Sequence, residues 1–229
     1  MIPICLALLS AVTPPPVLAD LGPEGLVRLR AIERALDAGE RDAQAWWTAW
    51  LFGLSAAAAL QTAAALGVER DAPVLQVGAV RAAVGAASVV LVPLPAAFAP
   101  GALRAMPEGT GPDRITKLKA AEEWLRRSAR VERLGKSWVP RVGGLLLNGA
   151  GSLWLWLHEQ RRGAALLSFG VGFLVGEAKI YTQPTAAIEA EERLLVEPSP
   201  AALEAPRPAP GVRWTLSAAP GALIVSGSF

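Results

Sequence analysis

The stretch that decides the fold is Val142–Thr182, VGGLLLNGAGSLWLWLHEQRRGAALLSFGVGFLVGEAKIYT, in which two apolar runs flank the charged turn 158–162. Extended to residues 139–158 and 163–182, each run reaches the ~20 residues that a helix needs to cross the hydrocarbon core of a bilayer. The pattern therefore predicts a hairpin of two transmembrane helices. The alternative is a helical hairpin in the core of a soluble protein, because the charge-free part of each run is shorter than a full span.

Small residues recur at every fourth position of the second helix. They are Ala164, Ser168, Gly172 and Gly176. This spacing places all four on one helix face, and in lipid a face of small residues lets two backbones approach closely. We expect this stripe to be a packing surface. The first helix has Gly144, Asn148 and Ser152 at the same spacing.

Two further spans are predicted upstream, at about residues 45–67 and 73–92. Residues 43–68 form a run of 26 without a charged side chain, and three tryptophans lie at its start, as in the aromatic belt of a membrane protein. Arg81 lies near the middle of the second of these spans. An arginine at mid-bilayer costs about 2.5–3.5 kcal/mol on insertion scales, so its side chain should face protein or water.

The composition agrees with a membrane protein. The chain of 229 residues is 52% hydrophobic and 18% charged, against the roughly 25% charged residues of ordinary soluble domains. The net charge of +2 gives no indication of nucleic-acid binding. With one cysteine, Cys5, and one histidine, His158, a zinc site built from these residue types is excluded, and we expect neither a metal nor a cofactor.

The remaining segments complete the predicted domain organisation. Residues 1–19 resemble a signal peptide, with an apolar core and small residues before Asp20 but without a basic start. Residues 20–42 form a charged amphipathic helix, and 183–211 form a charged helix end and a proline-rich linker. The alternating apolar residues of 212–229 predict a β-hairpin. The fold class is thus an all-α membrane protein: a bundle of four transmembrane helices within residues 43–182, in two hairpins, with an amphipathic helix between them and a short C-terminal β-hairpin.

The amphipathic helix between the hairpins covers residues 112–138. Apolar or small residues follow helical spacing on one face: Ile115, Leu118, Ala121, Leu125, Ser128, Val131, Leu134 and Trp138. Lysine and arginine take much of the rest, including Lys117 and Arg130. Two interpretations stay open. The helix lies in the headgroup layer and binds anionic lipid, or it packs over the end of the bundle with a solvated charged face.

Two signals for membrane orientation conflict. Four spans place the N-terminal helix, the connection 96–141 and the C-terminal tail on one side, here called side A; the turns 69–71 and 158–162 lie on side B. Side A carries fourteen lysines and arginines near the spans and side B three, which makes side A cytoplasmic by the positive-inside rule. A cleaved signal peptide makes side A external.

The polar residues of the spans fall into two groups by depth. Gln61, Arg81 and Asn148 lie eight to ten residues from the side B turns, which is roughly 12–15 Å at the helical rise, and this predicts a mid-membrane polar layer. His158, Glu177 and Lys179 are predicted near the interfaces. We expect Arg81 to be satisfied by Asn148, Gln61, backbone carbonyls or water, and Glu177 to meet Arg141, Lys136 or Lys179.

The sequence contains no Walker loop, dinucleotide fingerprint, paired histidines on a helix or nucleophile elbow, so we assign no catalytic or cofactor-binding residue. The leading hypothesis is a multi-pass protein, located in a bacterial inner membrane, with a structural, scaffolding or partner-binding role. Its expected partners are the bilayer, with anionic lipid at 112–138 as one candidate, and a protein partner or a second copy. The alternatives are a transporter or channel subunit that uses the polar layer, and a membrane enzyme that acts on lipid through Glu177 or His158.

Overall fold

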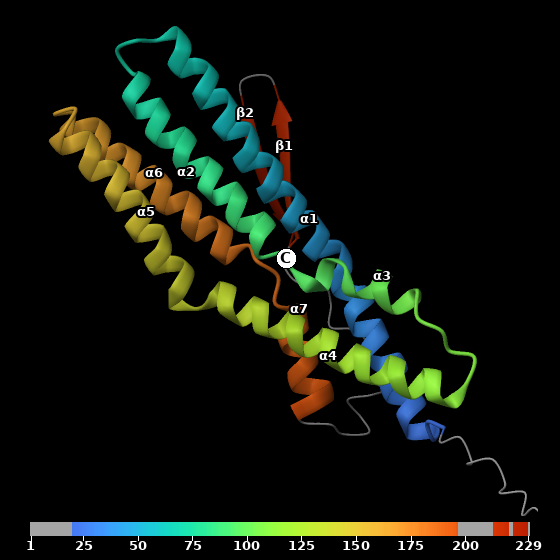
Figure 1. Ribbon diagram of the computed structural model, residues 1–229. Coiled ribbons are helices and arrows are strands. Elements are labelled where there is room, and N and C mark those ends of the chain that lie inside the picture. Colours follow the sequence, from blue (N-terminus) through green and yellow to red (C-terminus); the bar gives the residue numbers. More distant parts are fainter. Residues whose placement is uncertain (1–19, 197–212, 220–221, 229) are drawn as a thin grey trace, which may run out of the picture.

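The structure is a computed structural model that describes residues 20–196, 213–219 and 222–228. The part up to residue 196 is helical (Figure 1). Three of its helical stretches are long and apolar enough to cross a membrane: α1 (Pro23–Gly67), α2 (Ala72–Leu91) and the stretch Arg162–Val196. The last of these consists of α6 (Arg162–Tyr181), α7 (Ala186–Glu191) and a π-helical turn, η2 (Glu192–Val196).

Helix α1 joins two segments that the sequence predicts separately, the charged helix 20–42 and the span 45–67. It is continuous over 45 residues, because no proline interrupts it after Pro23. At 1.5 Å per residue it is about 68 Å long, more than twice the ~30 Å thickness of a hydrocarbon core. One end of α1 must therefore extend well beyond any membrane that the other end crosses.

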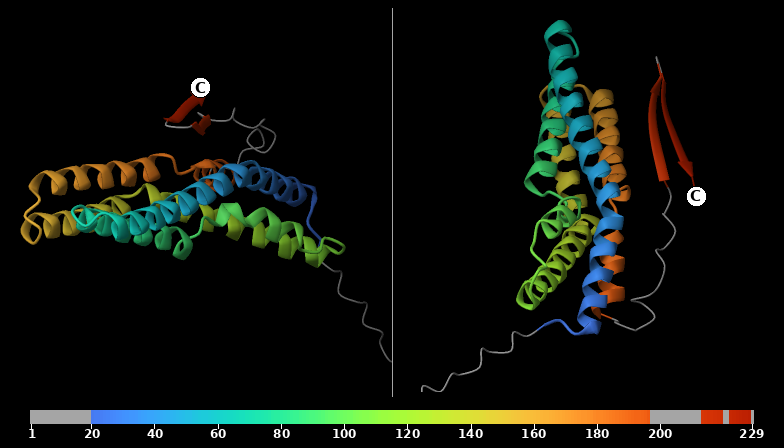
Figure 2. Two further views of the ribbon diagram at one scale, coloured as in Figure 1. Left: turned by 90° about the horizontal axis from the view of Figure 1, so that it is seen from above. Right: turned by 90° about the vertical axis from the view of Figure 1, so that its right-hand side faces the viewer.

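The half of the molecule that contains residues 43–67 of α1 is named the apolar half. It also contains α2, α5 (Trp138–Leu157) and α6. The pairs α1/α2 and α5/α6 form two helical hairpins that lie side by side (Figures 1 and 2). Large apolar side chains point outward, with Phe52, Leu146 and Leu167 between 68% and 71% exposed. This is the inverse of a water-soluble bundle.

The other half, named the polar half, contains the start of α1 together with α4 (Gly111–Lys136), α7, η2 and the short helices η1 (Pro95–Ala97) and α3 (Ala99–Arg104). The two short helices lie at the start of the predicted connection 96–141. This half has an ordinary buried core, because apolar side chains of all its longer elements meet in it. Its largest fully buried members are Leu29, Ile32, Leu103, Leu125 and Leu194.

Helix α4 packs against α1 and α7 with part of the face that the sequence predicts, including Ala121, Leu125 and Ser128. The prediction that Lys117 lies among the solvated cations is wrong: it is 3% exposed, because two carboxylates accompany it into the core. The helix begins with a capping box between Thr110 and Asp113. It ends before Ser137, whose extended backbone and capping hydroxyl start α5 in a new direction.

Beyond residue 196 the structure describes two strands, β1 (Arg213–Ala219) and β2 (Ala222–Ser228). They pair antiparallel, from Arg213 opposite Ser228 to Ala219 opposite Ala222. The predicted signal peptide, residues 1–19, and most of the predicted linker lie outside the described residues.

Candidate functional site

Arg81 of α2 is the polar centre of the apolar half. Its Nη1 donates to the carbonyl oxygen and the hydroxyl of Ser168 on α6, at 3.1 and 2.6 Å. Its Nη2 donates to the carbonyl oxygen of Asn148 and the hydroxyl of Ser152 on α5, at 2.6 and 2.8 Å. One guanidinium of the first hairpin thus holds both helices of the second. Its Nε is buried without a partner among the described residues.

Each of the three residues of the predicted layer lies over a glycine of a neighbouring helix. A Cβ atom built on Gly78 of α2 would lie 1.7 Å from the side-chain oxygen of Gln61, and one on Gly151 of α5 would lie 2.8 Å from the Arg81 guanidinium. A Cβ atom on Gly172 of α6 would lie 1.9 Å from the side-chain oxygen of Asn148. The glycines leave room for these polar side chains. Gln61 reaches from α1 to α2, Arg81 from α2 to α5, and Asn148 from α5 to α6.

The three residues do not share a single hydrogen-bond network among the described residues. Asn148 contacts Arg81 through its backbone oxygen, while its side-chain nitrogen donates to the carbonyl of Gly144 at 2.9 Å. None of the four hydrogen bonds of Arg81 goes to Gln61. Sequence reasoning missed Ser152 and Ser168 as partners of Arg81. Their signal was available, because both are hydroxyl residues within the small-residue stripes.

The predicted stripe of α6 contributes to packing at two of its members. Ser168 receives Arg81, and Gly172 makes room for Asn148. Ala164 is half-buried, and a Cβ atom on Gly176 would meet open space.

The residues predicted near the interfaces lie at the two ends of the apolar half. Glu177 accepts from Arg141 Nε at 3.4 Å, and Arg141 is one of the three partners that the sequence analysis names for it. Lys179 donates to the Ser88 hydroxyl at 2.8 Å, and His158 is exposed and stacks on Trp154.

Further contacts tie the hairpins at both ends. At the end next to the polar half, the indole N–H groups of Trp46 and Trp50 both donate to the Thr182 hydroxyl at 3.2 Å. At the opposite end, Arg161 forms an ion pair with Asp71 at 2.9 Å. The two hairpins are thus held together at three levels, of which Arg81 is the middle one.

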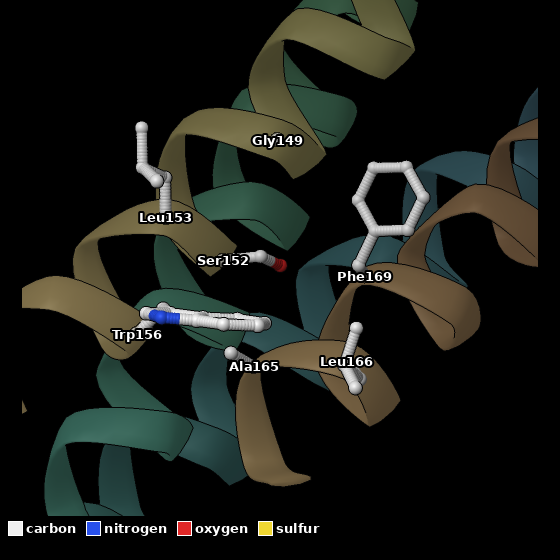
Figure 3. A pocket seen from close by; sticks show the side chains of 7 residues that line it. All are labelled: Gly149, Ser152, Leu153, Trp156, Ala165, Leu166 and Phe169. Atoms are coloured by element: carbon white, nitrogen blue, oxygen red, sulfur yellow. The ribbon is translucent and has the colours of Figure 1, made fainter. Parts of the chain in front are cut away.

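A crevice of about 190 Å³ lies between α5 and α6 (Figure 3). Trp156 and Phe169 flank it, and the hydroxyl oxygen of Ser152 points into it. Its lining is otherwise apolar. Among the residues that the structure describes, no group of three or more His, Cys, Asp or Glu side chains could hold a metal ion.

Buried charges of the polar half escaped the sequence reasoning. Lys117 Nζ lies 2.7 Å from a carboxylate oxygen of Glu33 and also donates to Glu108. Hydrogen bonds from Arg30 and Lys117 lower the pKa of Glu108 to about 2. These residues, with Arg104 and Asp37, line a cavity of about 250 Å³ in which cations and carboxylates alternate.

Glu132 of α4 is 1% exposed. One of its carboxylate oxygens accepts the backbone N–H groups of Ala187 and Ile188 in the first turn of α7, at 3.0 and 3.1 Å, and the other has no partner among the described residues. Burial raises the pKa of this carboxyl to about 7, although the two N–H groups act in the opposite direction.

No family model, curated protein or solved structure matches the chain.

Proposed function

We propose that this chain is a multi-pass membrane protein with a structural, scaffolding role and no catalytic activity. In this proposal α1, α2, α5 and α6 cross the bilayer as two hairpins and hold the polar half on one side of it, with β1 and β2 as a C-terminal β-hairpin. The observation that carries it is Arg81, whose hydrogen bonds join both hairpins and occupy its two terminal nitrogens with groups of the protein itself. Polar groups used in this way fix the packing of membrane helices.

The fourth span of the proposal is α5. Its one charged residue is Arg141, it is 20 residues long like α6, and it pairs with α6. A short turn joins the two, so α5 must cross the membrane if α6 does. Its exposed apolar side chains, such as Leu146 at 68% and Leu157 at 66%, are suited to lipid contact. A helical bundle of this kind suits a bacterial inner membrane, since outer-membrane spans are β-barrels.

The alternatives have weaker support. A lipid-directed enzyme would need an acid and a base within hydrogen-bond reach of one substrate. His158 follows the end of α5 and Glu177 lies fifteen residues into the antiparallel α6, so about 22 Å of helix separate their levels. A transport role has one favourable observation, the crevice beside Ser152, one of the groups that bind Arg81.

The number of spans is tested by labelling single cysteines from each side of the membrane, in a Cys5→Ser background. Glu69→Cys and Gln160→Cys lie in the two side B turns, and Lys119→Cys lies on the exposed face of α4. We expect the first two to react from one side and the third from the other. Reaction of Glu69→Cys and Gln160→Cys from opposite sides would rule out the four-span arrangement.

The scaffolding role is tested against transport in proteoliposomes that contain the full chain. We expect anion and cation flux equal to that of protein-free vesicles, both for the wild type and for Arg81→Met. We expect Arg81→Met to lower the unfolding temperature in detergent, because Ser152, Ser168 and the Asn148 carbonyl lose their donor. Flux that depends on Arg81 would replace the scaffolding proposal with the transport alternative.

A further inference from the structure

The exposed face of the second half of α4 changes from basic to apolar as it approaches α5. Arg127, Arg130, Leu134 and Trp138 follow one another at spacings of three, four and four residues. Both arginines are exposed, Leu134 is 48% exposed and Trp138 is 70% exposed. The opposite face of α4 packs against α1 and α7, so this face is open to the surroundings.

The two arginines have no anionic partner within residues 20–196. Neither forms an ion pair or a hydrogen bond with another described residue; the Arg127 guanidinium lies over the Trp124 ring at 5.6 Å. Their neighbours Arg126 and Arg133, by contrast, pair with Glu122 and Glu191. Two guanidiniums are therefore free to bind an external anion.

The position of this face matches the membrane interface. Arg130 lies eight residues before Trp138, the first residue of α5, which is about 12 Å along a helix. The two helices meet at an angle on the side of the molecule away from α1 (Figure 1), so the height of Arg130 above the start of the span is smaller than this. From that height the long side chain of an arginine can reach the headgroup phosphates, while tryptophan is favoured at the boundary below them.

We infer that the face formed by Arg127, Arg130, Leu134 and Trp138 binds anionic phospholipid. This rests on the proposed membrane function. The guanidiniums bind headgroup phosphates, for which arginine is well suited because of its paired donors, and Leu134 and Trp138 enter the glycerol and acyl region. An acidic protein would satisfy the arginines but would leave the two apolar side chains exposed. The contact involves only the second half of α4, since Lys117 in the first half is buried in the polar half.

The experiment compares phosphatidylglycerol with phosphatidylcholine, each added to the purified full chain in a neutral detergent, with the thermal unfolding midpoint as the measurement. The variants are Arg130→Gln and the double variant with Arg127→Gln. The matched control is Lys119→Gln, which removes an exposed cation of α4 that lies eleven residues further from α5 than Arg130 does and has no ion pair with another described residue.

We expect phosphatidylglycerol to raise the midpoint more than phosphatidylcholine does. Arg130→Gln should remove about half of this excess and the double variant nearly all of it, because each cation near an anionic surface contributes separately. Lys119→Gln should retain the excess. Equal shifts with both lipids would overturn the inference, and this is the result expected if the true partner is an acidic protein. A double variant that keeps the full excess would also overturn it.

Membrane extraction with alkaline carbonate separates this outcome from failure of the proposed function. A chain that stays in the membrane pellet but lacks the phosphatidylglycerol effect disproves only the lipid contact. A chain that is released as a soluble protein disproves the membrane function itself.

Discussion

Lys117 in the polar half and Arg81 in the apolar half are both cations that lie between helices. The two halves stabilise these cations with different partners. Lys117 meets two carboxylates, from Glu33 and Glu108, whose side chains are still 17% and 29% exposed. Arg81 meets only neutral oxygens, two hydroxyls and two backbone carbonyls. The difference follows from the surroundings. Next to water a carboxylate can be buried while it stays partly hydrated, whereas at the position in a bilayer that we propose for Arg81 a second charge would add a second desolvation cost.

The largest effect should come from Lys117→Met. It leaves Glu33 and Glu108 with Arg30, whose side chain is 52% exposed, as their remaining shared cation. Removal of one partner of a buried pair costs about 3–5 kcal/mol. Because both carboxylates are partly exposed, we expect about 3 kcal/mol, measured as a loss of unfolding free energy by denaturant titration in detergent micelles. The control Lys119→Met, on the same helix but exposed, should change the stability by less than about 0.5 kcal/mol. Equal losses would show that the buried triad contributes nothing special.

Glu132 extends the comparison to a buried carboxyl group of the polar half, with which no cation of the described residues forms an ion pair. Its carboxyl has a pKa of about 7 in the folded chain, raised from 4.5 mainly by burial. The folded state therefore keeps a proton that the unfolded state releases, and stability from this group is full below pH 4.5 and falls as the pH rises to about 7. The total loss corresponds to about 3 kcal/mol.

Unfolding of wild type and Glu132→Gln between pH 4 and pH 8 measures this dependence. The difference in stability between the two chains should move in favour of the variant as the pH rises, because an amide side chain does not titrate. Subtraction of the two profiles removes the contributions of other groups, among them Glu108, whose lowered pKa acts with the opposite sign at low pH. A constant difference would show that Glu132 titrates normally.

The glycines of the apolar half provide a smaller effect with a close control. Gly151→Ala puts a methyl group 2.8 Å from both the Arg81 guanidinium and a methyl of Val77, and overpacking of this kind costs about 1–3 kcal/mol. Gly149→Ala, on the same helix, meets nothing within 4 Å and should be neutral or slightly stabilising. The measurement is the unfolding midpoint in detergent. Equal midpoints for the two variants would contradict the inference that Gly151 leaves the space in which the Arg81 guanidinium packs.

The sequence predicted the apolar half better than the polar half, and the reason is physical. In the apolar half, depth follows from residue counts along straight helices, so Arg81 and Asn148 could be placed at one level and Glu177 at another. The contact with the Asn148 backbone rather than its amide could not be predicted, since it depends on helix rotation. Gln61 was expected beside Arg81, yet its side chain lies against Gly78, three residues earlier on α2.

In the polar half, the buried charges depend on partners that are distant in the sequence. Lys117 is buried only because Glu33 lies on α1 and Glu108 lies before α4. The periodicity of α4 gave its buried face only in part, since Glu132 is buried and Leu134 exposed. Nothing in the pattern distinguished Glu132 from the solvated carboxylates of the same helix, because its partners are backbone N–H groups of α7.

The smallest effect should come from the ion pair Arg141–Glu177, which lies where the two halves meet. Its side chains are 46% and 33% exposed and its N–O distance is 3.4 Å, so solvent screens most of the attraction. A double-mutant cycle with Arg141→Gln and Glu177→Gln should give a coupling energy of about 0.2–1 kcal/mol that shrinks in high salt. The same cycle on Lys117 and Glu33 should give a larger coupling that salt changes less, because Lys117 is buried and the side chain of Glu33 is 17% exposed. If the two couplings were equal, burial would not be what separates the charges inside this chain from those at its surface.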